Sequence, residues 1–136
     1  MRGTVLLLAG VDWSADYADH LRGNGLMVYE LHRPEDALRK VETVVPDVIV
    51  AVCSGSDDPA AIRELRNRVD RATSIIAIVM ASAVSGTNTD PSPVLEAGAD
   101  SVLLMQAPPD EVLYEVQRAL ILRRSGRRLP RTGGPV

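Results

Sequence analysis

The chain is poor in the residues that build disulfide bonds and zinc sites. It has one cysteine, Cys53, and two histidines, His20 and His32, among its 136 residues. A single cysteine excludes an internal disulfide bond, and these three side chains do not have the spacing of a zinc site. We therefore expect no thiol–metal chemistry, and we predict that the protein uses no metal ion and no cofactor.

Aromatic side chains and long apolar runs are also scarce. Phenylalanine is absent and aromatic residues make up 3% of the chain, so we expect an aliphatic core and no stacking platform for single-stranded nucleic acid. No apolar run reaches the roughly eighteen residues that span a bilayer, and the apolar run after Thr4 is too short for a secretory signal. The sequence thus predicts a cytoplasmic protein with no membrane partner.

The net charge of −3 combines an acidic body with a basic C-terminal end. The last fourteen residues contain five arginines and no acidic residue, so the rest of the chain carries −8. A duplex-binding domain carries its positive charge on a folded face that can neutralise phosphates, so we do not expect nucleic acid as a partner. We interpret residues 123–136 as a flexible tail or linker, with an electrostatic arm as the alternative.

The rest of the chain alternates between short apolar runs and segments with helical periodicity. Buried strands are predicted at residues 4–9, 26–31, 46–53, 74–81 and 101–105. Helices are predicted at about 12–22, from 34 to before 46, from 59 to about 69, briefly at 94–97, and at 109–122. This alternation predicts a single α/β domain over residues 1–122, in which right-handed crossovers build a parallel sheet covered on both faces.

The third predicted strand, PDVIVAVC, raises a question about function. Ligands bind at the carboxyl ends of the strands in such sheets, yet this strand delivers only Val52 and Cys53 to that edge. On strand alternation Cys53 should point away from the side of Val52. We prefer a buried structural cysteine to a redox switch, because no basic neighbour in the sequence lowers the pKa of its thiol.

Two segments resemble motifs of a known family. The order of the elements, with Pro46–Ala51 (PDVIVA) and Leu95–Leu103 (LEAGADSVL), resembles the receiver domain of bacterial two-component response regulators. The first segment is similar to that family's PDLVLLD strand and the second to its LEAGADDYL turn, and the likeness extends from residue 4 to about 122. It implies a flavodoxin-like, doubly wound five-stranded parallel sheet in the order 2-1-3-4-5 within a three-layer α/β/α sandwich.

The resemblance also shows which reactive residues are missing. Receivers are phosphorylated on an aspartate at the end of the third strand, beside a magnesium ion that two acids after the first strand hold. In this sequence the acid pair falls at Ala9 and Gly10, and the phosphoacceptor at Val52. The switch Ser/Thr falls at Ser82, or one residue earlier, and the lysine of the fifth strand falls at Met105.

These differences imply a degenerate pseudo-receiver, which is not an enzyme and signals by binding other proteins. We expect Ala9, Val52 and Met105 to close an apolar pocket at the carboxyl edge. Asp12, Asp57 and Asp58 could rebuild a displaced ion site, but helix capping is the preferred interpretation of these three acids.

The loop before the short fourth helix indicates a remodelled surface, in the region where receivers form dimer and partner faces. We therefore expect a protein partner, or a second copy, on the fourth helix, fifth strand and fifth helix. The candidate residues on this face are Val94, Leu95, Met105, Asp110 and Arg118. The alternative function is a small-molecule sensor or small enzyme that uses the carboxyl edge, although the sequence has neither a glycine-rich phosphate loop nor a Ser-His-Asp set.

Overall fold

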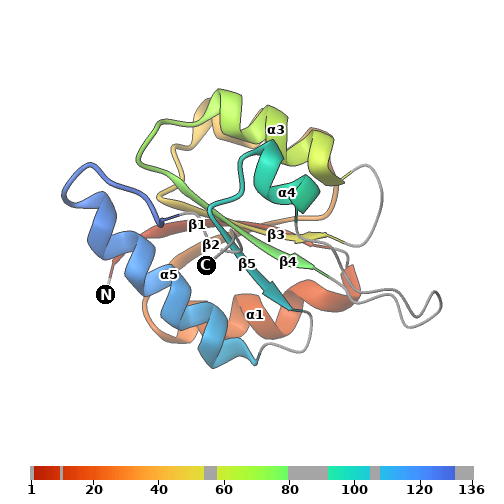
Figure 1. The fold of residues 1–136 in the computed structure, drawn as a ribbon. Helices are drawn as coiled ribbons and strands as arrows, with labels where there is room; N and C mark the ends of the chain where they lie inside the picture. Colours follow the sequence, from red (N-terminus) through yellow and green to blue (C-terminus); the bar gives the residue numbers. More distant parts are fainter. Residues whose placement is uncertain (1, 10, 54–57, 80–91, 105–107, 131–136) are drawn as a thin grey trace.

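The computed structural model describes residues 2–9, 11–53, 58–79, 92–104 and 108–130, with side chains for all of these except 11–15, 58, 92 and 104. Within these ranges five strands alternate with five helices (Figure 1). The strands are β1 (Thr4–Leu8), β2 (Met27–Leu31), β3 (Val48–Cys53), β4 (Ser74–Val79) and β5 (Ser101–Leu104). The helices are α1 (Val11–Gly23), α2 (Pro34–Thr43), α3 (Asp58–Arg68), α4 (Ser92–Ala97) and α5 (Pro109–Arg123). None of these described helices combines the length and the apolar content needed to cross a membrane.

The five strands form one parallel sheet in the order β2-β1-β3-β4-β5. Helices α1 and α5 cover one face of the sheet, and α2, α3 and α4 cover the other (Figure 1). This arrangement confirms the doubly wound three-layer sandwich and the strand order expected from the sequence. As predicted, α4 is short, with six residues.

The core is aliphatic and is divided by the sheet into two clusters. Side chains alternate along each strand, so Val5 and Leu7 of β1 pack toward α1 and α5, whereas Leu6 and Leu8 pack toward α2 and α3. All residues of β3 and β4 are buried. Strands covered by helices on both faces lose contact with water on both sides, which is why their sequences are continuously apolar.

Two glycines end helices where other residues would be strained. Gly25 follows α1 with a φ of 88°, and the N–H of Leu26 donates to the carbonyl of Leu21 at 3.3 Å. Gly98 follows α4 with a φ of 127°, and a Cβ there would lie 2.7 Å from Cγ of Arg66. The glycine of the LEAGAD segment is therefore required by backbone conformation and by close packing.

The segment Arg123–Pro130 folds back onto the domain. Leu129 is 2% exposed, and its N–H donates to Oγ of Ser74 at 2.8 Å. Nε of Arg128 lies 2.8 Å from Oδ1 of Asp100. The packed part of the chain therefore extends beyond the boundary expected at residue 122, and a flexible tail stays a prediction for residues 131–136, which lie outside the described part.

Candidate functional site

The carboxyl edge of the sheet is apolar where β1 and β3 end. The two strands are neighbours, with Leu8 beside Ala51, so Ala9 and Val52 follow at adjacent positions. Ala9 is 2% exposed and Val52 is 9% exposed, and both belong to the cluster packed under α1 and α5. The positions that the sequence assigned to an acid and to the phosphoacceptor are thus part of the core.

The backbone groups of Ala9 already have partners. Its N–H donates to the carbonyl of Leu31 at 3.0 Å, and its carbonyl accepts a hydrogen bond from Nδ1 of His32 at 2.9 Å. Magnesium needs several oxygen ligands, and the side chains of Ala9 and Val52 contain none. The described residues at this edge therefore do not fit a magnesium ion. Among all described residues, no three His, Cys, Asp or Glu side chains form a group that could hold a metal.

Some positions singled out from the sequence are not described. Gly10, Asp57, Ser82 and Met105 lie outside the described residues. Asp12 lies in α1 and Asp58 begins α3, but their side chains are not among the described ones. The apolar contact of Met105 and the choice between capping and ion binding for the three aspartates therefore stay predictions.

Cys53 lies on the opposite face of the sheet from Val52. Val52 packs toward α1 and α5, whereas Cys53 packs in the cluster under α2, α3 and α4. The thiol is buried, and its Sγ lies 3.7 Å from the carbonyl oxygen of Ala51, to which it donates. This confirms the alternation predicted for the end of the strand and the buried position of the thiol.

The expectation that Val94 and Leu95 line an exposed partner face is wrong. Each is 6% exposed, and Val94 packs in the cluster under α2, α3 and α4. A helix of six residues covers the sheet with its few apolar side chains, so these turn inward. Among the described side chains of α4, Pro93 and Glu96 are the exposed ones.

The two candidates on α5 do lie at the surface. Asp110 is exposed, and its Oδ1 lies 2.7 Å from Nε2 of His20 in α1. Arg118 is partly exposed, and its Nη1 donates to Oε1 of Glu115 at 2.8 Å. The guanidinium of Arg118 also lies 5.9 Å from the ring centroid of Tyr114. Of the five candidate residues, Asp110 and Arg118 are therefore the ones that the structure describes at the surface.

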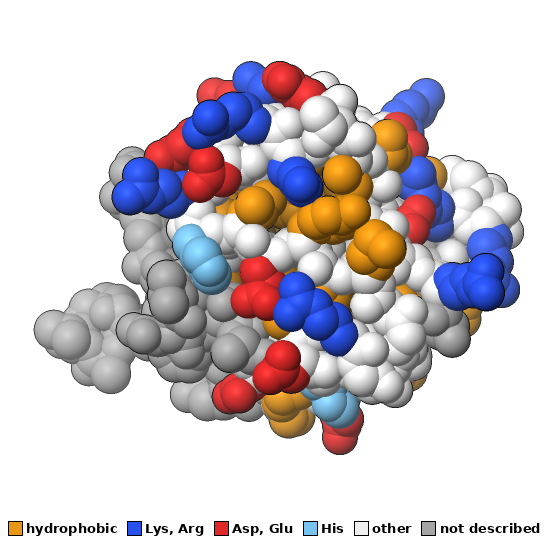
Figure 2. Space-filling model, turned by 180° about the vertical axis from the view of Figure 1, so that it is seen from behind, with side chains coloured by type: hydrophobic (Ala, Val, Ile, Leu, Met, Phe, Trp, Pro, Cys, Tyr) orange, Lys and Arg blue, Asp and Glu red, His pale blue; other side chains and the backbone are white. Residues whose placement is uncertain are grey.

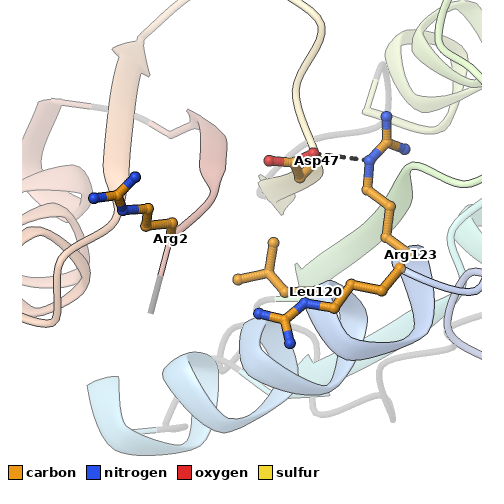
Figure 3. Close-up of a pocket in the computed structure, with 5 residues that line it drawn as sticks. Arg2, Asp47, Leu120 and Arg123 are labelled. Carbon is orange, nitrogen blue, oxygen red and sulfur yellow. Dashed lines mark ion pairs between the residues drawn. The ribbon is translucent and has the colours of Figure 1, made fainter.

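A network of ion pairs that the sequence did not predict lies at the opposite, amino edge of the sheet. Nε of Arg123 lies 2.8 Å from Oδ1 of Asp47, and its Nη2 lies 2.8 Å from Oδ2 of Asp70. The dashed line in Figure 3 marks the ion pair between Arg123 and Asp47. The hydrogen bond from Arg123 lowers the pKa of Asp70 to about 2. Oδ2 of Asp47 accepts the N–H of Thr4, so this acid joins two strand beginnings and the end of α5.

Asp100 is the buried centre of the same edge. Its Oδ2 accepts the N–H of Ile75 at 2.9 Å and a hydrogen bond from Nη1 of Arg66 at 3.2 Å, while Oδ1 faces Arg128. Burial raises the pKa of Asp100, and it lowers the pKa of Arg66. The aspartate of the LEAGAD segment thus fixes the start of β4. The sequence contained one sign of this network, an acidic residue directly before a strand, as at Asp47 before β3 and Asp100 before β5.

The amino edge also has a hollow of about 260 Å³. It is lined by Arg2, Asp47, Leu120, Arg123 and Arg124. In Figure 3 the guanidinium of Arg123 points to Asp47, and Arg2 lies on the other side of the hollow with its guanidinium turned away from both. The basic groups do not converge on one point, so the hollow does not have the geometry of an anion site.

Comparisons with known proteins give matches among solved structures. No family model matches the sequence, and no curated protein matches it. The receiver domain of a sensor histidine kinase from Pseudomonas aeruginosa, whose structure has a magnesium ion in its active-site cleft, is 26% identical with a TM-score of 0.72. That match covers 88% of this chain and 98% of the other.

Two further matches come from other organisms. A putative response regulator from Chloroflexus aurantiacus is 23% identical with a TM-score of 0.71, over 89% of this chain and 99% of the other. A CheY-like receiver domain protein from Methanospirillum hungatei is 14% identical with a TM-score of 0.77, over 93% of this chain and 99% of the other. The structural neighbours are response regulator receiver domains, and this chain has their CheY-like, flavodoxin-type fold.

Proposed function

We propose that this protein is a pseudo-receiver of the response regulator family. It is a regulatory module of two-component signalling that acts without aspartyl phosphorylation, by binding other proteins, and it is not an enzyme. The observation that carries this proposal is the pair of buried apolar side chains, Ala9 and Val52, at the edge where receiver chemistry requires carboxylates.

The chemistry at position 52 supports the proposal. Acceptance of a phosphoryl group requires a nucleophilic oxygen, sulfur or nitrogen, and a valine side chain has none. Position 10 is a glycine, which contributes no side chain to a metal site. The two changes remove both the atom that would be phosphorylated and ligands of the ion that would assist the transfer.

The position of the single lysine also supports the proposal. Lys40 is the chain's one lysine, and it lies in α2 with Nζ 4.8 Å from the ring centroid of Tyr29 in β2. Receivers carry their lysine on the fifth strand, and β2 and β5 are opposite edges of the sheet. Lys40 therefore cannot replace the missing charge at Met105.

The experiment that tests this function is an NMR titration of the isotope-labelled chain. Magnesium is added first and then beryllofluoride, which mimics an aspartyl phosphate. We expect the amide signals of Ala9, Val52, Ser82 and Met105 to stay unchanged. Saturable shifts at these residues would mean that other acids have rebuilt an ion site, and would overturn the proposal.

A matched control comes from the same chain. The variant Ala9→Asp, Gly10→Asp, Val52→Asp, Met105→Lys restores the carboxylates and the lysine of a working receiver, and a working receiver serves as control for the reagents. We expect magnesium-dependent shifts in the folded variant and none in the natural chain. An equal response of both would contradict the proposal. A small organic molecule that shifts the same signals in the natural chain would instead favour the sensor or enzyme alternative.

A further inference from the structure

Two hollows adjoin at the amino edge of the sheet. The first is the hollow of about 260 Å³ beside Arg123. The second has about 390 Å³ and is lined by Arg2, Gly3, Thr4, Gly25, Met27 and Asp47. Because Arg2 and Asp47 line both hollows, the two form one groove, which we call the amino groove. It crosses the starts of β2, β1 and β3 and reaches the end of α5.

The amino groove carries an excess of positive charge. Its described charged lining residues are three arginines and one acid, namely Arg2, Arg123, Arg124 and Asp47. The two carboxylate oxygens of Asp47 bind Arg123 and the N–H of Thr4, so this acid is satisfied within the chain. Arg2 and Arg124 are exposed, and neither forms an ion pair with another described residue. These two cations are therefore available to anions on another molecule.

The two available arginines do not point to a single anion. Arg2 lies across the hollow from Arg123, with its guanidinium turned away (Figure 3). Arg124 follows Arg123 at the end of α5. A single small anion bound at one of these two cations leaves the other unpaired. An extended chain that carries two separated anions can pair with both.

We propose that the amino groove binds an extended acidic segment of a partner protein. Two separated carboxylates of the segment pair with Arg2 and Arg124. An apolar side chain of the segment packs on Met27, which is 58% exposed in the second hollow. Gly25 adds no side chain there, so the main chain of the segment can approach closely. This proposal deepens the proposed function and rests on it, because it gives the binding module a surface and a class of partner.

The lining of the groove favours a peptide over a strand of nucleic acid. A nucleic acid carries a phosphate at every nucleotide, so its backbone would pass the carboxylate of Asp47, which repels phosphate. The described lining residues include no aromatic side chain on which a base could stack. An acidic segment can place its charges opposite arginine only and keep an uncharged residue beside Asp47.

Another surface of the molecule is apolar but does not indicate a partner. In Figure 2 apolar side chains gather in the middle of one face, and acidic and basic side chains surround them. Nη2 of Arg22 donates to the carbonyl of Val28 at 2.9 Å, so it closes part of the free edge of β2. Because charges of both signs surround this apolar area, it does not identify the chemistry of a partner. The excess of one sign distinguishes the amino groove.

The expected affinity is low. Exposed ion pairs contribute little to binding, and salt screens them. We therefore expect a dissociation constant between about 10 μM and 1 mM for an acidic peptide. It should rise with ionic strength.

An NMR titration of the isotope-labelled full chain with synthetic peptides tests the proposal. Each peptide has two glutamates, two leucines and several serines, with both ends blocked. In one set two, four or six residues separate the glutamates, and in matched isomers the glutamates are adjacent. We expect at least one separated peptide to shift the amide signals of Gly3, Thr4, Met27 and Asp47 with saturation. Its isomer has the same composition and net charge and should bind about threefold more weakly or less, because it reaches only one arginine.

Charge reversal tests the two arginines directly. Arg2→Glu and Arg124→Glu should each weaken the binding of the separated peptide by about threefold to tenfold, since each replaces an attraction with a repulsion. The double variant should lose this binding and should instead bind the peptide in which lysines replace the glutamates. Arg63→Glu on α3 is the control, because Arg63 is also exposed and has no ion pair with a described residue. It makes the same change of net charge and should leave the affinity unchanged.

The remaining outcomes separate this proposal from its alternatives. Circular dichroism checks that each variant is folded, which is expected because these arginines are exposed. Absence of saturable binding up to millimolar peptide, or an equal effect of Arg63→Glu and Arg124→Glu, would overturn the amino groove as a docking site. Tighter binding to anionic phospholipid vesicles or to a single-stranded oligonucleotide than to the peptides would also overturn it. These results would leave the absence of a phosphorylation response standing, whereas a response to beryllofluoride would overturn the proposed function without changing the peptide result.

Discussion

The two edges of the sheet use charge in opposite ways. At the carboxyl edge, Ala9 and Val52 are apolar and buried at the positions where the resemblance to receivers predicts carboxylates. At the amino edge, three carboxylates are paired with three arginines, namely Asp47, Asp70 and Asp100 with Arg66, Arg123 and Arg128. The described positions at which β1 and β3 end are thus apolar, whereas the amino edge is rich in paired acids.

Functional and structural charges in this fold differ in whether they are paired within the chain. Clustered carboxylates without cations repel one another and cost stability until a metal ion binds. At the amino edge each acid faces an arginine, and Asp47, Asp70 and Asp100 also accept backbone N–H groups. Charges satisfied within the chain stabilise the fold and leave no ligand unpaired.

The largest effect is expected for Asp100→Ala at the amino edge. This change leaves the half-buried guanidinium of Arg66 and the N–H of Ile75 without their partner. We expect a loss of about 3–5 kcal/mol in the free energy of unfolding, measured by urea denaturation. Asp100→Asn keeps an acceptor for the N–H of Ile75, so its free energy of unfolding should fall clearly less. Equal and small losses in both variants would mean that the network does not support the fold.

The next largest effect is expected for Val52→Asp at the carboxyl edge. A carboxylate placed in this apolar cluster should reduce the free energy of unfolding by about 3 kcal/mol at pH 7. Burial raises the pKa of the introduced carboxyl, so the group is protonated at pH 4 and the loss should be smaller there. Val52→Thr, which has nearly the same shape and no charge, is the control. A stable Val52→Asp variant at pH 7 would show that this edge tolerates charge after all.

A smaller effect is expected for Leu129→Ala in the returning segment. Leu129 is buried, so the change should reduce the free energy of unfolding by about 2 kcal/mol, measured by thermal melting and by urea. Ile121→Ala removes an exposed side chain from α5 and should change the stability of the monomer by less than about 0.5 kcal/mol. If both variants melt like the natural chain, the segment does not hold to the amino edge in solution.

The smallest effect concerns pH and Asp70. The hydrogen bond from Arg123 lowers the pKa of Asp70 from 3.8 to about 2. The lowered pKa contributes stability that is fully present above about pH 4 and is lost as the pH falls toward 2. Asp70→Asn should remove this part of the acid dependence, by less than about 1 kcal/mol because Asp70 is half exposed. If the free energy of unfolding of the variant falls with pH as it does in the natural chain, other groups cause that fall. Asp100, whose pKa burial raises, contributes in the opposite sense.

Several features could be predicted from the sequence because they depend on neighbouring residues. The alternation of apolar runs with helical periodicity gave the five strands and five helices within a few residues, and Cys53 was placed on the correct face by strand alternation. The six-residue α4 followed from the shortage of helix-forming residues before Gly98. The absence of an acid at position 52 is seen directly in the sequence.

Other features depended on residues that are far apart in the chain. Arg123 meets Asp70 across 53 positions, and Leu129 meets Ser74 across 55, so no local pattern could pair them. The same limit led to the wrong placement of Val94 and Leu95, since only the packing of α4 on the sheet decides which side of a short helix is buried.

Local patterns in the sequence predicted the class of fold and show a valine, which has no nucleophilic atom, at position 52, because backbone periodicity and side-chain chemistry are local properties. Contacts between distant segments place residues 124–130 against the amino edge and leave Tyr114 and Ile121 exposed on α5. These outcomes depend on which surfaces meet when the helices close over the sheet. Burial of apolar side chains and ion pairing between distant segments determine which surfaces come into contact.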